Sequence, residues 1–266
     1  MPSALPVTVL GAGGWLGRSV VSELQSQGRL VQPVRRETLD RWLMEVEPAG
    51  AVIDAIGLTA DFRRKPFETV KAHVSVLSQV MQRPGIQTLI YLSSTRVYAR
   101  SAITSEAAAL PCLSSDPSDL YNLSKLTGEA LVLQDPRPGF KAVRLSNVVG
   151  EGQPSTTFVG SLLQEARQTG RVQIRQPPHT AKDYIALPDV CRLLAALTGE
   201  SKERLYNLGS GRNTSHLEIA GWLESHGVRV AFAEQGEAGI SFPVLDTQRL
   251  NAEYGSVGNP FEQRLL

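Results

Sequence analysis

The stretch VTVLGAGGWLGRSVVSELQSQGRLVQPVRR, residues 7–36, places four glycines between a short apolar run and a segment with helical spacing of its apolar side chains. The run VTVL predicts a strand, and the segment after the glycines predicts an amphipathic helix. Glycine in a strand-to-helix turn permits positive φ and lets a pyrophosphate approach the backbone, while the helix N-terminus attracts its negative charge. We therefore expect a dinucleotide-binding turn made by Gly11, Gly14, Trp15, Leu16 and Gly17.

The spacing of these glycines is GxxGxxG, with Gly13 in addition. The GxGxxG spacing of many dehydrogenases would need a glycine at Leu16. A tight turn without a ligand is the alternative interpretation, because a glycine motif alone is weak evidence. Its place at the first turn from strand to helix favours the cofactor site.

The end of the next expected strand, residues 30–34, is followed by two arginines rather than by an acid. An acidic residue there usually binds the adenosine ribose of NAD, whereas guanidinium groups suit the 2′-phosphate of NADP. Arg35 and Arg36 therefore favour NADP as the cofactor, with NAD as the alternative. The alternative interpretation is that Arg35 and Arg36 are simply solvated charges at the end of a strand and bind no cofactor.

Short apolar runs rich in Val and Ile alternate with longer segments of helical period over the first 145 residues. This pattern is typical of βαβ units and a parallel sheet. We predict an α/β fold, a Rossmann-like doubly wound parallel sheet with a smaller C-terminal substrate lobe. The expected strands are residues 7–10, 30–34, 51–56, 88–92 and 141–145, and the expected helices are residues 15–27, 38–46, 66–82, 118–133, 156–169, 188–198 and 215–226.

After Leu145 the alternation gives way to stretches rich in Gly, Pro and Ser, which predict a smaller lobe assembled from late segments. We assign residues 1–148 and 179–207 to an NAD(P)-binding Rossmann lobe. Residues 149–178 and 208–266 are assigned to a small substrate-binding lobe.

The composition of the chain indicates which kinds of molecule it binds. The 266 residues are 42% hydrophobic and 20% charged, with a formal net charge of +1, so the basic surface of a nucleic-acid binder is missing. The two cysteines, Cys112 and Cys191, lack the spacing of a metal site or a disulfide framework. The sequence shows neither a signal peptide nor an apolar run long enough for a membrane span. We expect a cytoplasmic protein with a small-molecule substrate, no metal, no nucleic acid and no membrane partner.

The segment YNLSKLTGE places Tyr121 and Lys125 four residues apart on one expected helix. Side chains at this spacing project from one helix face. Such pairs occur by chance in many proteins, but here the stretch LIYLSSTRVYA upstream ends an expected strand in Ser93, Ser94 and Thr95. We therefore expect a hydroxyl of this group beside Tyr121 at the carboxyl edge of the sheet.

Seven motifs follow one another along nearly the whole chain: GxxGxxG, DAIG (54–57), SSTRVY (93–98), YxxxK (121–125), VRLSNVVG (143–150), KDYIALPDV (182–190) and YNLGSG (206–211). In kind and order they resemble those of the extended short-chain dehydrogenase/reductases, the NAD(P)-dependent epimerase/dehydratase family. The resemblance implies an oxidoreductase or epimerase acting on a nucleotide sugar or a related sugar.

The resemblance also implies roles for individual residues. Tyr121 would move a proton to or from a substrate hydroxyl while hydride is transferred at the nicotinamide. Lys125 would lower the tyrosine pKa and bond the nicotinamide ribose, and Ser94 would hydrogen-bond the reacting oxygen, with Thr95 as the alternative. Asn147 falls where family members often contact the substrate diphosphate, although an Asn at this place could equally form a turn. The remaining implied contacts are Ala55, Ile56 and Gly57 with the cofactor, and Thr95, Asn147 and Lys182 with the substrate.

Some positions depart from the family pattern. The 4,6-dehydratases of the family carry two carboxylates where this chain has Thr95 and Arg96, so the elimination lacks its acid and base and a dehydratase is disfavoured. Lys182 stands where the family usually has Arg. His73 stands where relatives commonly have Asn, and both a structural histidine and one facing the cofactor fit the sequence.

Several questions are open at the level of sequence. A reductase and an epimerase use the same Ser, Tyr and Lys, and a non-catalytic NAD(P)-sensing or partner-binding protein with this fold is an alternative from another class. The apolar positions within residues 67–80 and 120–133 fit either the core or the interface of a homodimer. The identity and stereochemistry of the sugar have no signature that we can read.

Overall fold

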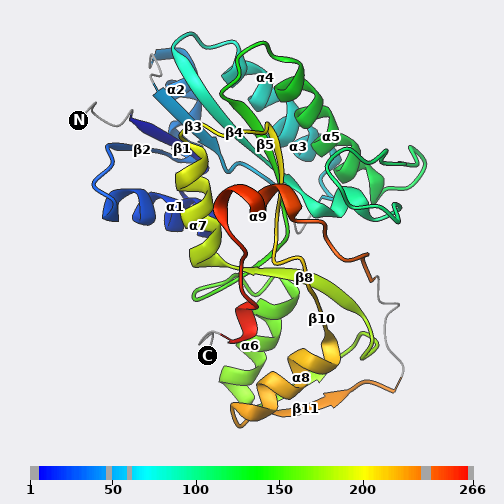
Figure 1. The fold of residues 1–266 in the computed structure, drawn as a ribbon. Coiled ribbons are helices and arrows are strands. Elements are labelled where there is room, and N and C mark those ends of the chain that lie inside the picture. The colour runs from blue at the N-terminus through cyan, green and yellow to red at the C-terminus, as the bar shows by residue number, and fades with distance from the viewer. Residues whose placement is uncertain (1–5, 46–49, 59–61, 235–240, 263–266) are drawn as a thin grey trace.

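The computed structural model describes residues 6–45, 50–58, 62–234 and 241–262. It consists of a large lobe built on a parallel sheet and a smaller lobe that packs below the carboxyl ends of that sheet in the view of Figure 1. In the described residues no helix has the length and apolar character needed to cross a membrane.

The large lobe contains a sheet of six parallel strands in the order β2-β1-β3-β4-β5-β9. Because β1 lies between β2 and β3, the direction of winding reverses at β1, and ligands bind at such switch points beyond the carboxyl ends of the strands. The predicted fold class is confirmed. The strands are β1 (Val7–Leu10), β2 (Val31–Val34), β3 (Gly50–Asp54), β4 (Ile86–Ser94), β5 (Phe140–Leu145) and β9 (Leu205–Leu208).

Helices cover both faces of this sheet because its strands are apolar on both sides. Along β4, Leu89 and Tyr91 pack against one layer of helices, and Ile90 and Leu92 pack against the other. One layer contains α1 (Trp15–Ser26) and α7 (Leu187–Leu197), joined by the C-terminal α9 (Gln248–Tyr254). The opposite layer contains α2 (Leu39–Glu45), α3 (Pro66–Val70), α4 (Val76–Met81) and α5 (Asp119–Gln134).

The predicted helix over residues 66–82 is interrupted in its middle. A π-helical turn, η2 (Lys71–Ser75), separates α3 from α4. Single π turns inside helices occur often at functional sites, because the extra residue re-aims the side chains around it. Here the re-aimed residue is His73, which is fully buried. The predicted helix over residues 38–46 begins with the 3-10 turn η1 (Arg36–Thr38), and its last residue lies outside the described ranges.

The small lobe is made of segments that are far apart in the sequence. Its three-stranded sheet has the order β10-β8-β6, and its two-stranded sheet pairs β11 with β7. Two helices cover these sheets around a separate apolar core that includes Leu162, Tyr184 and Leu223. The elements are β6 (Asn147–Val149), α6 (Phe158–Thr169), β7 (Arg171–Ile174), β8 (Ala181–Ala186), β10 (Asn213–Ser215), α8 (His216–Ser225), β11 (Arg229–Phe232) and the 3-10 turn η4 (Pro260–Glu262).

Two segments lie differently from the expected division of the chain. β8, expected in the Rossmann lobe, pairs with β6 and β10 in the small sheet. α9, expected in the small lobe, packs against β9, and its Leu250 belongs to the core of the large lobe. The chain therefore crosses between the lobes more often than the predicted boundaries allow, and the crossings occur around the candidate site.

Candidate active site

A cavity of about 520 Å³ lies between the two lobes at the carboxyl ends of β1, β3, β4 and β5. Its walls bring together most of the side chains that the sequence singled out. Gly11, Arg35 and Arg36 are not among the residues that line it. The predicted residues that do line it are Gly14, Trp15, Leu16, Gly17, Ala55, Ile56, Gly57, Ser94, Thr95, Tyr121, Lys125, Asn147 and Lys182.

The glycine turn is packed too tightly for side chains. Gly11 has φ of +75°, and a Cβ on it would lie 2.8 Å from the carbonyl oxygen of Ala55. A Cβ on Gly17 would lie 2.3 Å from the carbonyl oxygen of Gly11. α1 therefore starts directly against the turn, and no side chain caps its N-terminus at Gly14. Uncapped N–H groups at the start of a helix form an anion site, so the turn fits the diphosphate of a dinucleotide.

We expect Gly17→Ala to abolish tight binding of NAD(H) and NADP(H), because the new methyl group pushes α1 away from the turn. Overpacking of this kind costs about 1 to 3 kcal/mol in stability as well. Fluorescence titration of the reduced cofactors measures the binding. Gly13→Ala is the matched control, since a Cβ there meets only the Arg35 side chain, at 3.8 Å. Equal affinities for the two variants would show that the turn does not hold the cofactor.

Arg35 and Arg36 follow β2 and are exposed. The Arg35 side chain passes close to Gly13 in the glycine turn, as the 3.8 Å approach to that Cβ position shows. The pair thus lies at the adenosine end expected for a dinucleotide bound across the turn, outside the cavity itself.

Ser94, Tyr121 and Lys125 meet at one wall of the cavity. Ser94 ends β4, and its hydroxyl accepts a hydrogen bond from the backbone N–H of Arg96 at 3.2 Å. Tyr121 and Lys125 come from the first turns of α5, and both are nearly fully buried. Burial raises the pKa of Tyr121, while a hydrogen bond from Ser94 and the positive charge of Arg96 act in the opposite direction. The arrangement places a phenol and an alcohol beside each other, both able to bond one substrate oxygen.

The ammonium group of Lys125 is hydrogen-bonded to the backbone and feels the charge of the buried Asp54. Its Nζ donates to the carbonyl oxygen of Leu92 at 2.7 Å. Burial lowers its pKa to about 8, although the charges of Asp54 and Glu129 favour the protonated form. Burial also raises the pKa of Asp54 to about 6, against the hydrogen bond from the Ile56 N–H and the charge of Lys125. The sequence motif DAIG contains Asp54, but no signal in it assigned the residue a role.

The structure gives His73 a structural position next to Tyr121. Its Nε2 accepts a hydrogen bond from the Leu58 N–H at 3.3 Å, so the proton lies on Nδ1, which is 2.9 Å from the Ser124 hydroxyl. Ser124 in turn donates to the carbonyl oxygen of Tyr121, and the His73 and Tyr121 rings contact edge to face at 5.2 Å. His73 therefore links the loop after β3 to the first turn of α5.

Burial and the charge of Lys125 lower the pKa of His73 to about 3, from an ordinary 6.5. In the unfolded chain the histidine binds a proton below pH 6.5, so the stability contributed by neutral His73 is present above that pH and is lost as the pH falls toward 3. We expect the free energy of unfolding to fall over this range by up to about 1.4 kcal/mol per pH unit for this one group. His73→Asn is expected to flatten the pH dependence measured by urea unfolding, whereas the exposed His226→Asn leaves it unchanged.

The three residues expected to contact the substrate differ in how far their side chains are already bonded within the protein. Asn147 is bound at Nδ2 to the carbonyl oxygen of Asp183 at 2.8 Å, and Thr95 Oγ1 lies 3.5 Å from the carbonyl oxygen of Leu145. Lys182 has its Nζ 6.0 Å from the centre of the Phe158 ring. Burial and the charge of Arg96 lower the pKa of Lys182. Its ammonium group is available to an anionic ligand.

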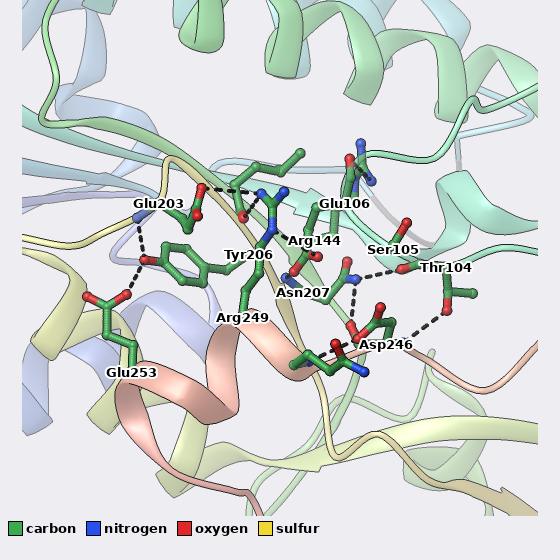
Figure 2. Close-up of polar contacts among 12 residues, drawn as sticks. Thr104, Ser105, Glu106, Arg144, Glu203, Tyr206, Asn207, Asp246, Arg249 and Glu253 are labelled. Atoms are coloured by element: carbon green, nitrogen blue, oxygen red, sulfur yellow. Dashed lines mark hydrogen bonds and ion pairs between the residues drawn. The ribbon is translucent and has the colours of Figure 1, made fainter.

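The C-terminal segment closes one side of the cavity through Phe242, Pro243 and Leu245, which the sequence did not single out. Thr104 fixes this segment, because its Oγ1 donates to the Val244 carbonyl oxygen at 2.7 Å. The same Oγ1 accepts from the Asp246 N–H at 2.9 Å (Figure 2). The amide of Asn207, at the end of β9, donates to the carbonyl oxygens of both Thr104 and Asp246 (Figure 2).

The fold and the cavity define a class: an α/β protein with a dinucleotide-binding turn and a Ser, Tyr and Lys cluster in one cleft. Residues 7–209 match the model of the NAD dependent epimerase/dehydratase family, and the chain belongs to this family of NAD-dependent sugar-nucleotide epimerases, dehydratases and dehydrogenases. The family expected from the motifs is confirmed.

Relatives within this family have several activities. The chain is 25% identical over 284 residues to dTDP-6-deoxy-L-talose 4-dehydrogenase (NAD(P)(+)) of Kitasatospora kifunensis, covering 92% of this chain and 86% of that protein. The structure is similar to UDP-glucose 4-epimerase of Thermotoga maritima, with a TM-score of 0.81, 17% identity and coverage of 96% and 94%. It is also similar to RMD of Pseudomonas aeruginosa complexed with NADPH, with a TM-score of 0.77, 23% identity and coverage of 98% and 96%.

Proposed function

We propose that this protein is an NAD(P)-dependent oxidoreductase or epimerase that acts on a nucleotide-linked sugar. The observation that carries the proposal is the meeting of Ser94, Tyr121 and Lys125 in the cavity that also contains the glycine turn. A buried phenol beside an ammonium group and an alcohol suits proton exchange with a substrate hydroxyl or carbonyl. Two of the proteins named above, the dTDP-6-deoxy-L-talose 4-dehydrogenase and the UDP-glucose 4-epimerase, act on nucleotide-linked sugars, which supports the substrate class.

The chain offers a site for each part of the cofactor. The amides of Trp15, Leu16 and Gly17, at the uncapped start of α1, would hold the diphosphate, and residues 55–57 line the same cavity. Lys125 lies next to Gly57, with its Nζ 3.9 Å from the Cβ position there, where it can bond a ribose hydroxyl. The bound nicotinamide supplies hydride transfer.

The residues of the site then divide the work on the substrate. Ser94 donates to the oxygen of the reacting carbon and holds it in place. Tyr121 exchanges the proton of that oxygen, and the positive charge of Lys125 favours the phenolate that the exchange produces. Lys182 and Asn147, on the small-lobe side, bind the diphosphate of the nucleotide sugar. Elimination of water is disfavoured, because Thr95 and Arg96 replace carboxylates next to Ser94.

Mass spectrometry of the small molecules released from the freshly purified, denatured protein tests the cofactor and the reaction type. Near-stoichiometric NAD indicates an epimerase that retains its cofactor and rejects the assignment of NADP. A cofactor-free protein that binds NADPH more tightly than NADH indicates a reductase that exchanges its cofactor. If neither cofactor binds, the proposed function is wrong.

We expect NADP as the cofactor, selected by Arg35 and Arg36. Arg35→Ala is expected to weaken NADPH binding about 10- to 100-fold, the loss of one or two charge-assisted hydrogen bonds, while NADH binding stays near that of the wild type. Arg41→Ala, which removes an exposed arginine of α2, is the matched control. An equal loss for both cofactors would contradict recognition of the 2′-phosphate.

A homodimer also stays a prediction. Four apolar side chains on α3 and α5 are exposed in the single chain, which supports an interface through these helices: Phe67, Val70, Leu123 and Leu131. Light scattering of the purified protein decides it, and a mass of 28.8 kDa would reject the dimer.

A further inference from the structure

Arg96 lines the cavity with a guanidinium group that forms no ion pair within the described part of the chain. The residue follows Thr95 in the 3-10 turn η3 (Thr95–Tyr98) directly after β4. Its Nε is completely covered and makes no hydrogen bond, and among the described residues its side chain forms no hydrogen bond and no ion pair. The contact that the structure does show is with the ring of Phe62, whose centre lies 5.3 Å from Cζ.

A half-buried guanidinium whose covered Nε has no hydrogen-bond partner is unusual, because removing an ionised group from water is costly unless it is paired. The neighbouring Arg144 shows the ordinary solution. It is bonded to both carboxylate oxygens of Glu129 and to the Tyr98 hydroxyl. Arg96 lacks such a partner although it lies at the end of the strand adjacent to that of Arg144.

The acids near Arg96 are already engaged. Asp119 binds Arg100 at 2.7 Å, and Asp116 binds the same guanidinium. Asp183, which also lines the cavity, accepts hydrogen bonds from the Ser146 and Ser210 hydroxyls at 2.6 and 3.0 Å. The charges of Asp119 and Asp116 support the protonated form of Arg96, but neither acid forms an ion pair with it in the described part of the chain, so its guanidinium group can bind the anion of a ligand.

The position of Arg96 fixes where that ligand carries its negative charge. The Phe62 ring beneath the guanidinium packs against the Tyr121 ring with 5.1 Å between centres. The positive charge of Arg96 also acts to lower the pKa of Tyr121, against the effect of burial. An anion bound to Arg96 is therefore expected at the Tyr121 wall of the cavity, and Lys182 enters the same cavity from β8 of the small lobe.

We propose that Arg96 binds a carboxylate on the sugar ring, so that the substrate is a nucleotide-linked uronic acid. The inference rests on the proposed function and specifies its substrate class. A guanidinium group matches a carboxylate through two parallel hydrogen bonds, and the two Nη groups of Arg96 form no hydrogen bond within the described residues and can make them. The diphosphate of the same substrate has its own cation in Lys182, so the site offers one positive group for each charged part.

The test compares an acidic sugar with its neutral counterpart on the same nucleotide. Calorimetry measures binding of UDP-glucuronic acid and UDP-glucose to the cofactor-loaded protein, and of the same acid and neutral pair carried on dTDP and GDP. We expect the acid to bind more tightly than the neutral sugar. Arg96→Gln is expected to weaken binding of the acid about 10- to 100-fold and to leave the neutral sugar nearly unchanged.

Lys182→Gln is the matched control, because loss of a diphosphate contact weakens both members of each pair alike. Arg96→Lys keeps the positive charge but removes the planar guanidinium group that makes two parallel hydrogen bonds. It serves as the test if Arg96→Gln does not fold, and it is expected to weaken binding of the acidic sugar only, and only in part. If either Arg96 variant weakens both sugars equally, the residue acts on the diphosphate or on Tyr121, and the inference is wrong while the proposed function stands. If no nucleotide sugar binds to the wild type, the proposed function falls and the inference falls with it.

Discussion

Tyr121→Phe is expected to lower kcat about 10²- to 10⁴-fold, the range typical of a lost general acid or base. The ring is held by Phe62 on one side and His73 on the other, so Phe at this position keeps the packing and removes only the hydroxyl. Steady-state turnover of the nucleotide sugar measures the loss. Titration of the reduced cofactor checks that binding is kept.

Tyr91→Phe is the matched control for this substitution. Tyr91 is also buried, its hydroxyl has no hydrogen-bond partner among the residues that the structure describes, and it is not among the residues lining the cavity. Its removal is expected to leave turnover nearly unchanged. Full turnover in Tyr121→Phe would reject the proton-exchange role and favour a non-catalytic protein with this fold.

The large lobe could be predicted from sequence because its signals are local. Five of the six strands of the sheet were expected as short apolar runs with helices between them, and this alternation implies parallel pairing. The sixth strand, β9, was not among the expected strands. The glycine turn and the pair Tyr121 and Lys125 are also local patterns, four to eleven residues long. Ser94 lines the same cavity as this pair, because the strand ends of a parallel sheet meet at one edge.

The small lobe could not be predicted in the same way. β10 pairs with β8 and β11 pairs with β7, and in each case a long stretch of chain separates the two strands. No short turn joins the paired strands, so nothing local in the sequence indicates their register. The position of α9 against β9 depends on tertiary packing at Leu250, which resembles any other apolar residue in the sequence. Non-local pairing of this kind leaves no periodic signal.

Parts of the site were missed for a related reason. The spacing of SSTRVY placed Arg96 near Ser94, but the absence of an ion-pair partner is a property of the assembled structure. The wall formed by Leu245 depends on hydrogen bonds between Thr104 and a segment 140 residues later. The sequence did not assign a role to Asp54, because an aspartate at the end of a buried strand often only accepts a hydrogen bond from the following turn, as Asp54 does from the Ile56 N–H.

Glu129→Ala is expected to lower the free energy of unfolding by about 3 to 5 kcal/mol, because it leaves the buried Arg144 without its counter-charge. Glu129 joins α5 to two strands: Arg144 of β5 binds it at 2.7 Å and Ser93 of β4 donates to it at 2.5 Å. Urea unfolding measures the loss. Glu45→Ala, which breaks the exposed pair with Arg41, is the control and is expected to cost about 0 to 1 kcal/mol.

Loss of Glu129 also acts on the site, one turn away on the same helix face. The charge of Glu129 supports the protonated form of Lys125, whose pKa burial lowers to about 8. Without that charge the pKa of Lys125 falls further, so the alkaline limb of kcat/KM is expected to move to lower pH in Glu129→Ala but not in Glu45→Ala. An unfolding free energy equal to that of Glu45→Ala, together with an unmoved alkaline limb, would show that the buried pair neither stabilises the fold nor sets the charge of Lys125.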